Sequence, residues 1–305
     1  MGKIELDHTG SGSGITLSSD GTSLLLDGTA IGGGGGPTLF AENPSSSSSP
    51  TATGTDAVAI GDSRGTASGS RAVSIGNSIS SGDDSFACQV SSNSSSYGSI
   101  GLGSVALLGS SKASGGFSIA IGQETQSTSA GSTALGFRTT ASQTYSFACG
   151  AESVSSIRGK FAYAGGRFSA TGDAQTGIFV LYSNTTDATA KALSTNNATA
   201  SYYNQIILPD NSAFAFHGTI VARQQASGGT ASAAWKIEGL IRREGTASTT
   251  TLVNSATTVL DNTPSWGMAL SADTTNGGLA ITVTGAAATN IRWVATIHTS
   301  EVTYA

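Results

Sequence analysis

The chain has 305 residues, of which 11% are charged and 41 are glycine, and its formal net charge is −5. This composition is poor in helix-forming residues and favours an all-β, repeat-rich protein over an α/β enzyme. The small net charge and the lack of a basic cluster argue against a nucleic-acid-binding surface. The longest apolar runs span only a few residues, so the sequence predicts no membrane insertion.

Residues 1–31 contain three short apolar stretches, around Ile4, at residues 15–17 and at residues 24–26, separated by Gly and Asp-Gly turns. They predict three short strands that are too small a piece to be stable alone. We expect this segment to attach the chain to a partner or to intertwine with other copies, and a frayed segment without a role is the alternative. The polar start of the chain predicts no secretory signal peptide.

Residues 32–52 are rich in Gly, Ser and Pro and predict a flexible linker. The five glycines at 32–36 are not followed by Gly-Lys-Ser/Thr, so a phosphate-binding loop is not indicated.

From residue 53 to 170 a five-residue word returns at intervals of about fourteen residues, a signature of solenoids. It reads AVAIG at 57–61 and AVSIG at 72–76, and similar words follow as far as FAYAG at 161–165. Each word alternates large and small side chains, which predicts a strand, and its closing Gly allows a bend. The Ser, Thr, Gly and Ala between the words predict a second short strand in each period.

One such period cannot bury a core, but roughly eight stacked coils about 4.8 Å apart would form a rod of about 40 Å. We expect an uncharged flank of this rod to pack against further copies around a symmetry axis. The predicted repeat core comprises Val58, Ile60, Val73, Ile75, Phe86, Cys88, Ile119, Ile121, Leu135, Phe147 and Cys149.

These words and their Ser/Ala/Gly spacers resemble the head repeats of trimeric autotransporter adhesins, which also occur in tail fibres of tailed bacteriophages. The resemblance implies a left-handed parallel β-roll that trimerises, with two further copies of the chain as partners. Two words near residues 98–109 lie too close together for one coil each, which predicts an irregular or bulged coil there.

Cys88 and Cys149 occupy the position that Ile60 has in its word. They lie about four coils apart, or near 20 Å, which is beyond the roughly 7 Å Cα separation that a disulfide allows. We expect both to be small, buried, reduced thiols.

Residues 171–305 lose the period and contain longer alternating strands with turn signals between them. About seven to nine antiparallel strands, each with one apolar face, predict a β-sandwich or jelly roll. His217 and His298 fall on the predicted outer faces. This part is similar to the C-terminal β domains of phage tail-fibre proteins in the stretches GDAQ at 172–175, AWKIEG at 234–239, ITVTG at 281–285, RWVA at 292–295 and TSEV at 299–302.

The sequence contains no clear catalytic pattern. His8, His217 and His298 show no metal-ligand spacing, and no serine-hydrolase elbow follows a strand. A polysaccharide depolymerase needs two carboxylates, and each candidate is more simply explained as a turn residue or a solvated side chain. These candidates are Asp173, Asp187, Glu238, Glu244, Asp261 and Asp273. We therefore predict that the chain is not an enzyme and has no cofactor or metal.

Aromatic residues of the C-terminal part offer a possible receptor contact. Trp235 and Trp293 alternate with aliphatic residues and belong to the predicted core. Tyr202, Tyr203 and Trp266 lie at strand edges near loops, where they could stack on sugar rings while Asp273 and Asn276 donate or accept hydrogen bonds. The alternative is that these aromatic residues cap the core.

We therefore expect a homotrimeric structural fibre of a tailed bacteriophage, located in the virion tail or baseplate and assembled in the cytoplasm of the bacterial host. Its N-terminal strands would bind another virion protein, and its C-terminal domain would contact a glycan or protein of the host surface. Three identical tips give avidity, so each contact can be weak. The alternatives are a glycan-degrading tail spike, a capsid or baseplate connector without receptor binding, and a bacterial trimeric adhesin, against which the missing signal and anchor count.

Overall fold

The computed structural model describes residues 50–61, 65–90 and 96–304, together with the backbone of four short strands near the N-terminus. Contacts divide the chain into two compact units, Met1–Ser45 and Ser46–Ala305. In the first unit, the described strands form an antiparallel sheet in the order β1-β2-β3-β4. Their bounds are β1 (Ile4–Leu6), β2 (Ile15–Ser19), β3 (Leu24–Leu26) and β4 (Thr29–Ala30). His8 and residues 32–49 of the predicted linker lie outside the described residues.

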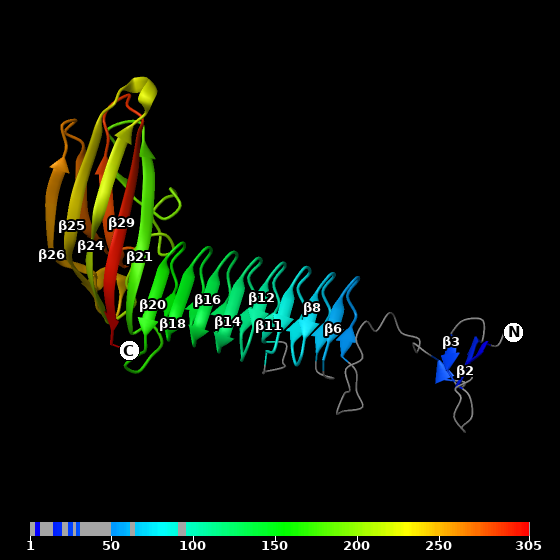
Figure 1. Ribbon diagram of the computed structural model, residues 1–305. Coiled ribbons are helices and arrows are strands. Elements are labelled where there is room, and N and C mark those ends of the chain that lie inside the picture. Colours follow the sequence, from blue (N-terminus) through cyan, green and yellow to red (C-terminus); the bar gives the residue numbers. More distant parts are fainter. Residues whose placement is uncertain are drawn as a thin grey trace. The chain divides into compact units, whose positions relative to one another are not determined.

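The second unit begins with a solenoid of short parallel strands, which we call the shaft (Figure 1). Within the described residues it has eight coils, and each coil gives one strand to each of two sheets. The strands of the first sheet are β6 (Val58–Ile60), β8 (Val73–Ile75), β10 (Phe86–Cys88), β12 (Val105–Leu107), β14 (Ile119–Gln123), β16 (Thr133–Phe137), β18 (Phe147–Ala151) and β20 (Phe161–Gly165). The repeated words form these strands, as the sequence predicts.

The spacers between the words form the second sheet of the shaft, which confirms the predicted second strand per period. Its strands are β5 (Thr51–Ala52), β7 (Thr66–Ala67), β9 (Ile79–Ser80), β11 (Gly98–Ser99), β13 (Lys112–Ala113), β15 (Gln126–Ser127), β17 (Thr140–Ala141) and β19 (Val154–Ser155). Thr51 and Ala52, which the sequence assigns to the linker, already belong to the first coil.

The inside of the shaft is filled by small residues, which corrects the predicted repeat core. From the second coil onward the central residue of each word is completely buried, as Ala87, Ala120 and Ala148 show, whereas the flanking large residues point outward and are half-buried or exposed. In the first coil the central Ala59 is half-buried. Alternation places large and small side chains on opposite faces, and the two sheets of so thin a coil leave room between them for small side chains, mostly Ala, Ser and Thr. Val90 is the largest side chain in the buried cluster around Ala87 and Ala106. The residues predicted as repeat core therefore lie on the outer face of the shaft.

The predicted irregularity near residues 98–109 is wrong in its position. Gly98–Ser99 and Val105–Leu107 are the two strands of one regular coil, one in each sheet. The longer interval precedes them, because Phe86 pairs with Val105 in the next coil. The extra residues therefore lie between Cys88, which ends β10 in one coil, and Gly98, which begins β11 in the next.

The C-terminal part of the second unit, which we call the head, is an antiparallel β-sandwich, as predicted (Figure 1). One sheet has the order β26-β25-β24-β29-β21 and continues through β20 into the first sheet of the shaft, and we call this continuous sheet the long sheet. In the other sheet β28 pairs with β22, β23 and β27. The head strands are β21 (Ala174–Thr185), β22 (Lys191–Ala192), β23 (Ile206–Ile207), β24 (Ser212–Gln224), β25 (Ser232–Arg243), β26 (Thr251–Asp261), β27 (Gly267–Asp273), β28 (Gly278–Thr284) and β29 (Ile291–Thr303).

The core of the head lies between these two sheets and follows the predicted faces. The indole rings of Trp235 and Trp293 stack with centroids 5.8 Å apart, and Phe179 and Ile281 are completely buried in the same cluster. Ile157 of the last coil also belongs to this core, so shaft and head share buried surface. The helices of the described residues are two short 3₁₀ turns, Ala226–Gly228 and Ala247–Thr249, and neither is long enough to cross a membrane.

Candidate functional site

The outer face of the long sheet carries the large side chains of the words in two straight rows. Parallel strands in register place each side chain beside its equivalents in the neighbouring coils. The first row contains Val58, Val73, Phe86, Val105, Ile119, Thr133, Phe147 and Phe161. The second row contains Ile60, Ile75, Cys88, Leu107, Ile121, Leu135, Cys149 and Tyr163. None of these described residues is charged.

Both rows continue in register from the shaft into the head. The first row passes through Ile178, His298, His217 and Glu238. The second row passes through Thr176, Ser300, Ala215 and Leu240. The sequence separates the two histidines, but the fold stacks their rings with centroids 5.3 Å apart on the predicted outer face. One surface of one sheet therefore joins shaft and head.

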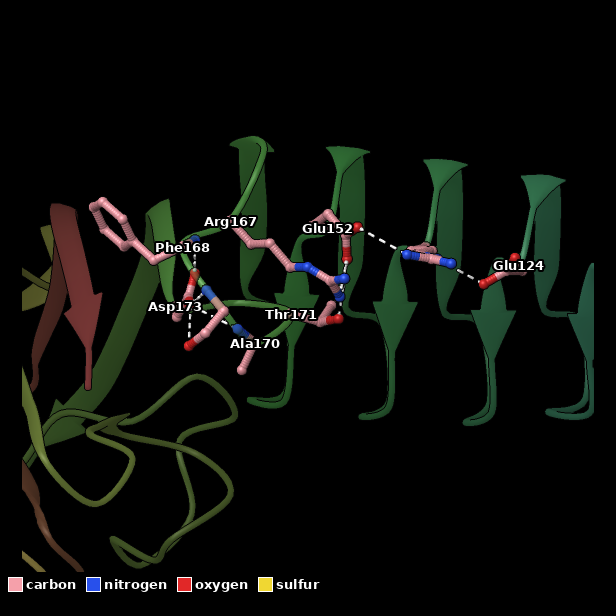
Figure 2. A network of polar contacts seen from close by, with 9 residues as sticks. Glu124, Glu152, Arg167, Phe168, Ala170, Thr171 and Asp173 are labelled. Carbon is pink, nitrogen blue, oxygen red and sulfur yellow. Dashed lines mark hydrogen bonds and ion pairs between the residues drawn. The ribbon is translucent and has the colours of Figure 1, made fainter. Parts of the chain in front are cut away.

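A ladder of alternating charges runs along one turn of successive coils and ends at the head (Figure 2). Arg138 Nε lies 2.7 Å from Glu124 Oε2, and Arg138 Nη1 lies 3.6 Å from Glu152 Oε1. Glu152 is buried and also accepts hydrogen bonds from Arg167 and from the hydroxyl of Thr171. Glu152 thus fastens the loop that leaves the last coil.

The carboxylate of Asp173 holds the next part of this loop. Oδ1 accepts a hydrogen bond from the N–H of Phe168 at 2.9 Å, and Oδ2 accepts bonds from Ser169 and Ala170 at 2.7 Å each. Burial raises the pKa of Asp173, but these N–H donors outweigh burial and bring the pKa below its usual value. The backbone carbonyl of Asp173 accepts a further bond from Thr303. The loop is therefore fixed to the last strand, and the Phe168 ring points away from this network (Figure 2).

Tyr202 and Tyr203, two of the predicted receptor contacts, lie together on an exposed turn of the head. Their rings are 3.7 Å apart, their hydroxyls are hydrogen-bonded, and the hydrogen bond raises the pKa of Tyr202. The carbonyl of Tyr203 accepts a hydrogen bond from the N–H of Arg158 in the last coil. The turn is thus tied to the shaft, and it presents two aromatic rings to solvent.

Trp266 is not the exposed aromatic residue that the sequence allowed. It is 5% exposed, and its ring packs 5.7 Å from that of Trp293. The side chain of Asn262 brackets it by accepting from its N–H and donating to its carbonyl. The alternative prediction, that this residue caps the core, is confirmed for Trp266.

Asp273 and Asn276 form part of the turn between β27 and β28. The Asp273 carboxylate accepts hydrogen bonds from the N–H groups of Thr275 and Asn276 and from the Asn276 amide. These groups therefore shape the turn, and their role in receptor contact stays a prediction.

The carboxylates considered for sugar cleavage have partners in the structure. Asp187 and Asp261 accept hydrogen bonds from Thr189 and Thr263. Glu238 and Glu244 lie 4.0 Å from Lys236 and Arg242. These four carboxylates thus have a turn-forming or solvated setting, whereas Asp173 is buried and holds its loop. In the described part of the chain, no three His, Cys, Asp or Glu residues gather into a group that could hold a metal ion.

Cys88 and Cys149, both within the described residues, are free thiols, as the sequence predicts. They are half-buried in the second row rather than inside the coil. Partial burial raises the pKa of the Cys149 thiol.

The most exposed aromatic residues of the described chain lie at the base of the head, on a surface that the sequence did not predict. Phe168 and Tyr304 are 79% and 88% exposed. They line a hollow of about 550 Å³ with Ser169, Val302 and Thr303. The available signal was an aromatic residue two positions after the Gly165-Gly166 pair, and another directly after the last alternating strand.

No family model matches the sequence, and no curated protein matches it either. Among solved structures, the chain is similar to tailspike protein gp49 of Acinetobacter baumannii bacteriophage Fri1, a capsular polysaccharide depolymerase. The two chains are 10% identical with a TM-score of 0.24, and the match covers 74% of this chain and 39% of the tailspike. At this level of similarity no residue role is transferred. The neighbour is nevertheless an enzyme, which contradicts the prediction that the present chain is not one, and that prediction is withdrawn.

Proposed function

We propose that this chain forms a homotrimeric fibre or spike of a tailed-bacteriophage tail. In this proposal the shaft sets the distance to the host and provides stiffness, and the head contacts the host surface. The N-terminal strands attach the protein to another virion protein. The repeats that resemble those of phage fibres and trimeric adhesins support this assignment.

The observation that carries the proposal is the pair of uncharged rows on the outer face of the shaft. Leu135 and Tyr163 are 43% and 50% exposed in the single chain, and seven coil steps of about 4.8 Å extend the rows over roughly 34 Å. Soluble monomers rarely expose so continuous an apolar surface. The inside of the coil is already filled, mostly by Ala, Ser and Thr, and has no room for these side chains. Burial against further copies therefore gives the rows their stabilising role.

The mass of the purified full chain in solution tests this assembly. Light scattering after size-exclusion chromatography is expected to give three times the mass of one chain, which is 30.2 kDa. A mass of one chain would contradict the proposal.

The head has the features of a surface that meets glycans. The exposed Tyr202–Tyr203 pair on its fixed turn offers flat apolar faces of the kind on which sugar rings stack. Binding of the purified protein to intact host cells, with Tyr202→Ala and Tyr203→Ala as test variants, measures this contribution. Unchanged binding of the double variant would remove the turn from the receptor site.

A tail spike that cleaves the bound glycan is the second form of this proposal, since the sequence analysis left it open. Incubation with purified host capsule, followed by an assay for new reducing ends, separates a spike from a binding fibre. New reducing ends that appear in proportion to protein concentration would assign the glycan-degrading form.

A further inference from the structure

A second hollow at the base of the head lies on the outer face of the long sheet, next to the one that Phe168 and Tyr304 line. It has a volume of about 420 Å³, and its lining includes Ala174, Ala213 and Ala215 from neighbouring strands together with Leu240 and Val302. Small side chains make the hollow, because Ala213 and Ala215 leave space where the large residues of the rows stand elsewhere. The second row of the shaft leads directly into it through Ser300 and Ala215.

The floor of this hollow offers little free charge to a ligand. Glu301 lines it, but its carboxylate is 2.6 Å from Lys160 Nζ and accepts a further hydrogen bond from Gln175 at 2.7 Å. The Glu301 side chain is only 2% exposed, and both of its carboxylate oxygens already have partners within the protein. The hollow therefore suits an apolar or aromatic occupant.

Two protruding aromatic side chains stand beside the hollow. Phe168 and Tyr304 line the hollow of about 550 Å³ described above, and Val302 lines both hollows. Both are held by backbone contacts, because Asp173 fixes the N–H of Phe168 and the carbonyl of Asn211 accepts from the N–H of Tyr304 at 2.9 Å. One surface thus combines an uncharged hollow with two exposed aromatic side chains whose backbone is held in place. We call Phe168, Ala213, Ala215, Leu240, Val302 and Tyr304 the basal patch.

We propose that the basal patch is the contact between neighbouring heads in the assembled protein, with Phe168 and Tyr304 of one copy seated in the hollow of the next. The inference rests on the proposed assembly of copies. Projecting side chains that enter a hollow elsewhere on the next copy form a heterologous contact. Such a contact closes into a ring when the rotation between copies divides a full turn, as it does in a trimer. The rows that lead into the patch belong to the face on which the shafts are proposed to meet, so the two contacts form one continuous interface.

Hydroxyl-radical footprinting of the full-length protein tests the proposal on a sample whose mass has been measured. In a single chain the exposed fractions are 79% for Phe168 against 69% for Phe117, and 88% for Tyr304 against 64% for Tyr145. Single-chain exposure therefore predicts faster oxidation of Phe168 and Tyr304 than of the matched residues on the shaft. The proposed contact predicts the reverse order, with Phe168 and Tyr304 severalfold slower.

The outcomes separate this inference from the proposed function. A monomeric sample overturns the assembly and the head contact together. An assembled sample in which Phe168 and Tyr304 oxidise faster than Phe117 and Tyr145 overturns the head contact alone. An assembled sample with the reversed order supports both.

A pair of matched variants gives a second readout. Ala215→Trp fills the hollow, whereas Ala188→Trp makes the same change at an exposed residue of the loop that follows β21, outside both rows. We expect Ala215→Trp to assemble through its shaft but to lose the protection of Phe168 and Tyr304, and Ala188→Trp to keep it. If Phe168 and Tyr304 are equally protected from oxidation in both variants, these two side chains do not occupy the hollow.

Discussion

The ammonium Nζ of Lys160 lies 2.6 Å from carboxylate Oε2 of Glu301, and the two side chains are 4% and 2% exposed. Lys160 directly precedes the last strand of the shaft, and Glu301 lies near the end of the last strand of the head. The Lys160 ammonium also lies over the rings of Phe179 and Phe214. This ion pair therefore joins the last coil of the shaft to the last strand of the head, and its two residues are 141 positions apart in the sequence.

Removing one partner of this pair should destabilise the protein strongly. We expect Lys160→Met to lower the free energy of unfolding by about 3–5 kcal/mol, because it leaves the Glu301 carboxylate buried and uncompensated. The double variant Lys160→Met/Glu301→Gln should recover part of this loss, because no unpaired charge remains. Urea unfolding followed by tryptophan fluorescence of the head measures both. A single variant as stable as the wild type would show that the pair is not buried in solution.

The loop held by Asp173 should lose stability in acid. The pKa of Asp173 is lowered in the folded protein, so its contribution is fully present above the unfolded-state pKa of about 3.9 and disappears as the pH falls through the lower folded-state pKa. Asp173→Asn replaces one accepting oxygen by a donor that faces N–H groups, which should cost about 1–3 kcal/mol at pH 7. The stability difference between wild type and variant should shrink as the pH falls below about 4. A difference that is independent of pH would contradict the role of the ionised carboxylate.

Much of this architecture could be predicted from local patterns, because alternation reports on faces directly. The repeated words predicted the strands of the shaft, and the alternation in β24 and β29 placed His217 and His298 on the outer face. Alternation cannot say which face is inside, however. The narrow space between the sheets decides that, and it admits Ala87 and Ala148 but excludes Phe86 and Phe147.

Other features depend on contacts that the local sequence does not encode. Strand β26 carries no clear alternating pattern in the sequence, because most of its residues are exposed and a strand without a buried face has no reason to alternate. Trp266 is buried because the Asn262 side chain folds its loop back onto the core. The Lys160–Glu301 pair and the basal patch join segments whose proximity follows only from the complete sheet.

Close stacking of the coils should make one glycine of the words irreplaceable. Gly136 has φ +122°, a conformation that residues with a Cβ rarely adopt, and a Cβ there would overlap the carbonyl of Gly150 in the next coil. We expect Gly136→Ala to cost at least about 2 kcal/mol. Gly165→Ala is the matched control, since a Cβ at Gly165 meets nothing within 4 Å. Thermal unfolding followed by far-ultraviolet circular dichroism should separate the two variants, and equal melting temperatures would refute the tight stacking.

The copies should be unable to assemble without the two uncharged rows on the outer face of the shaft. Leu135 lies in the middle of the second row and is 43% exposed in the single chain, so Leu135→Glu is compatible with the fold of one chain but would bury an unpaired carboxylate between copies. We expect the variant to shift the mass in solution from three chains to one, with a far-ultraviolet spectrum that retains the signal of the head. Tyr202→Glu introduces the same charge at a residue that is 55% exposed and lies outside the rows, and it should remain fully assembled. If Leu135→Glu keeps the wild-type mass, the rows face solvent and the copies associate through another surface.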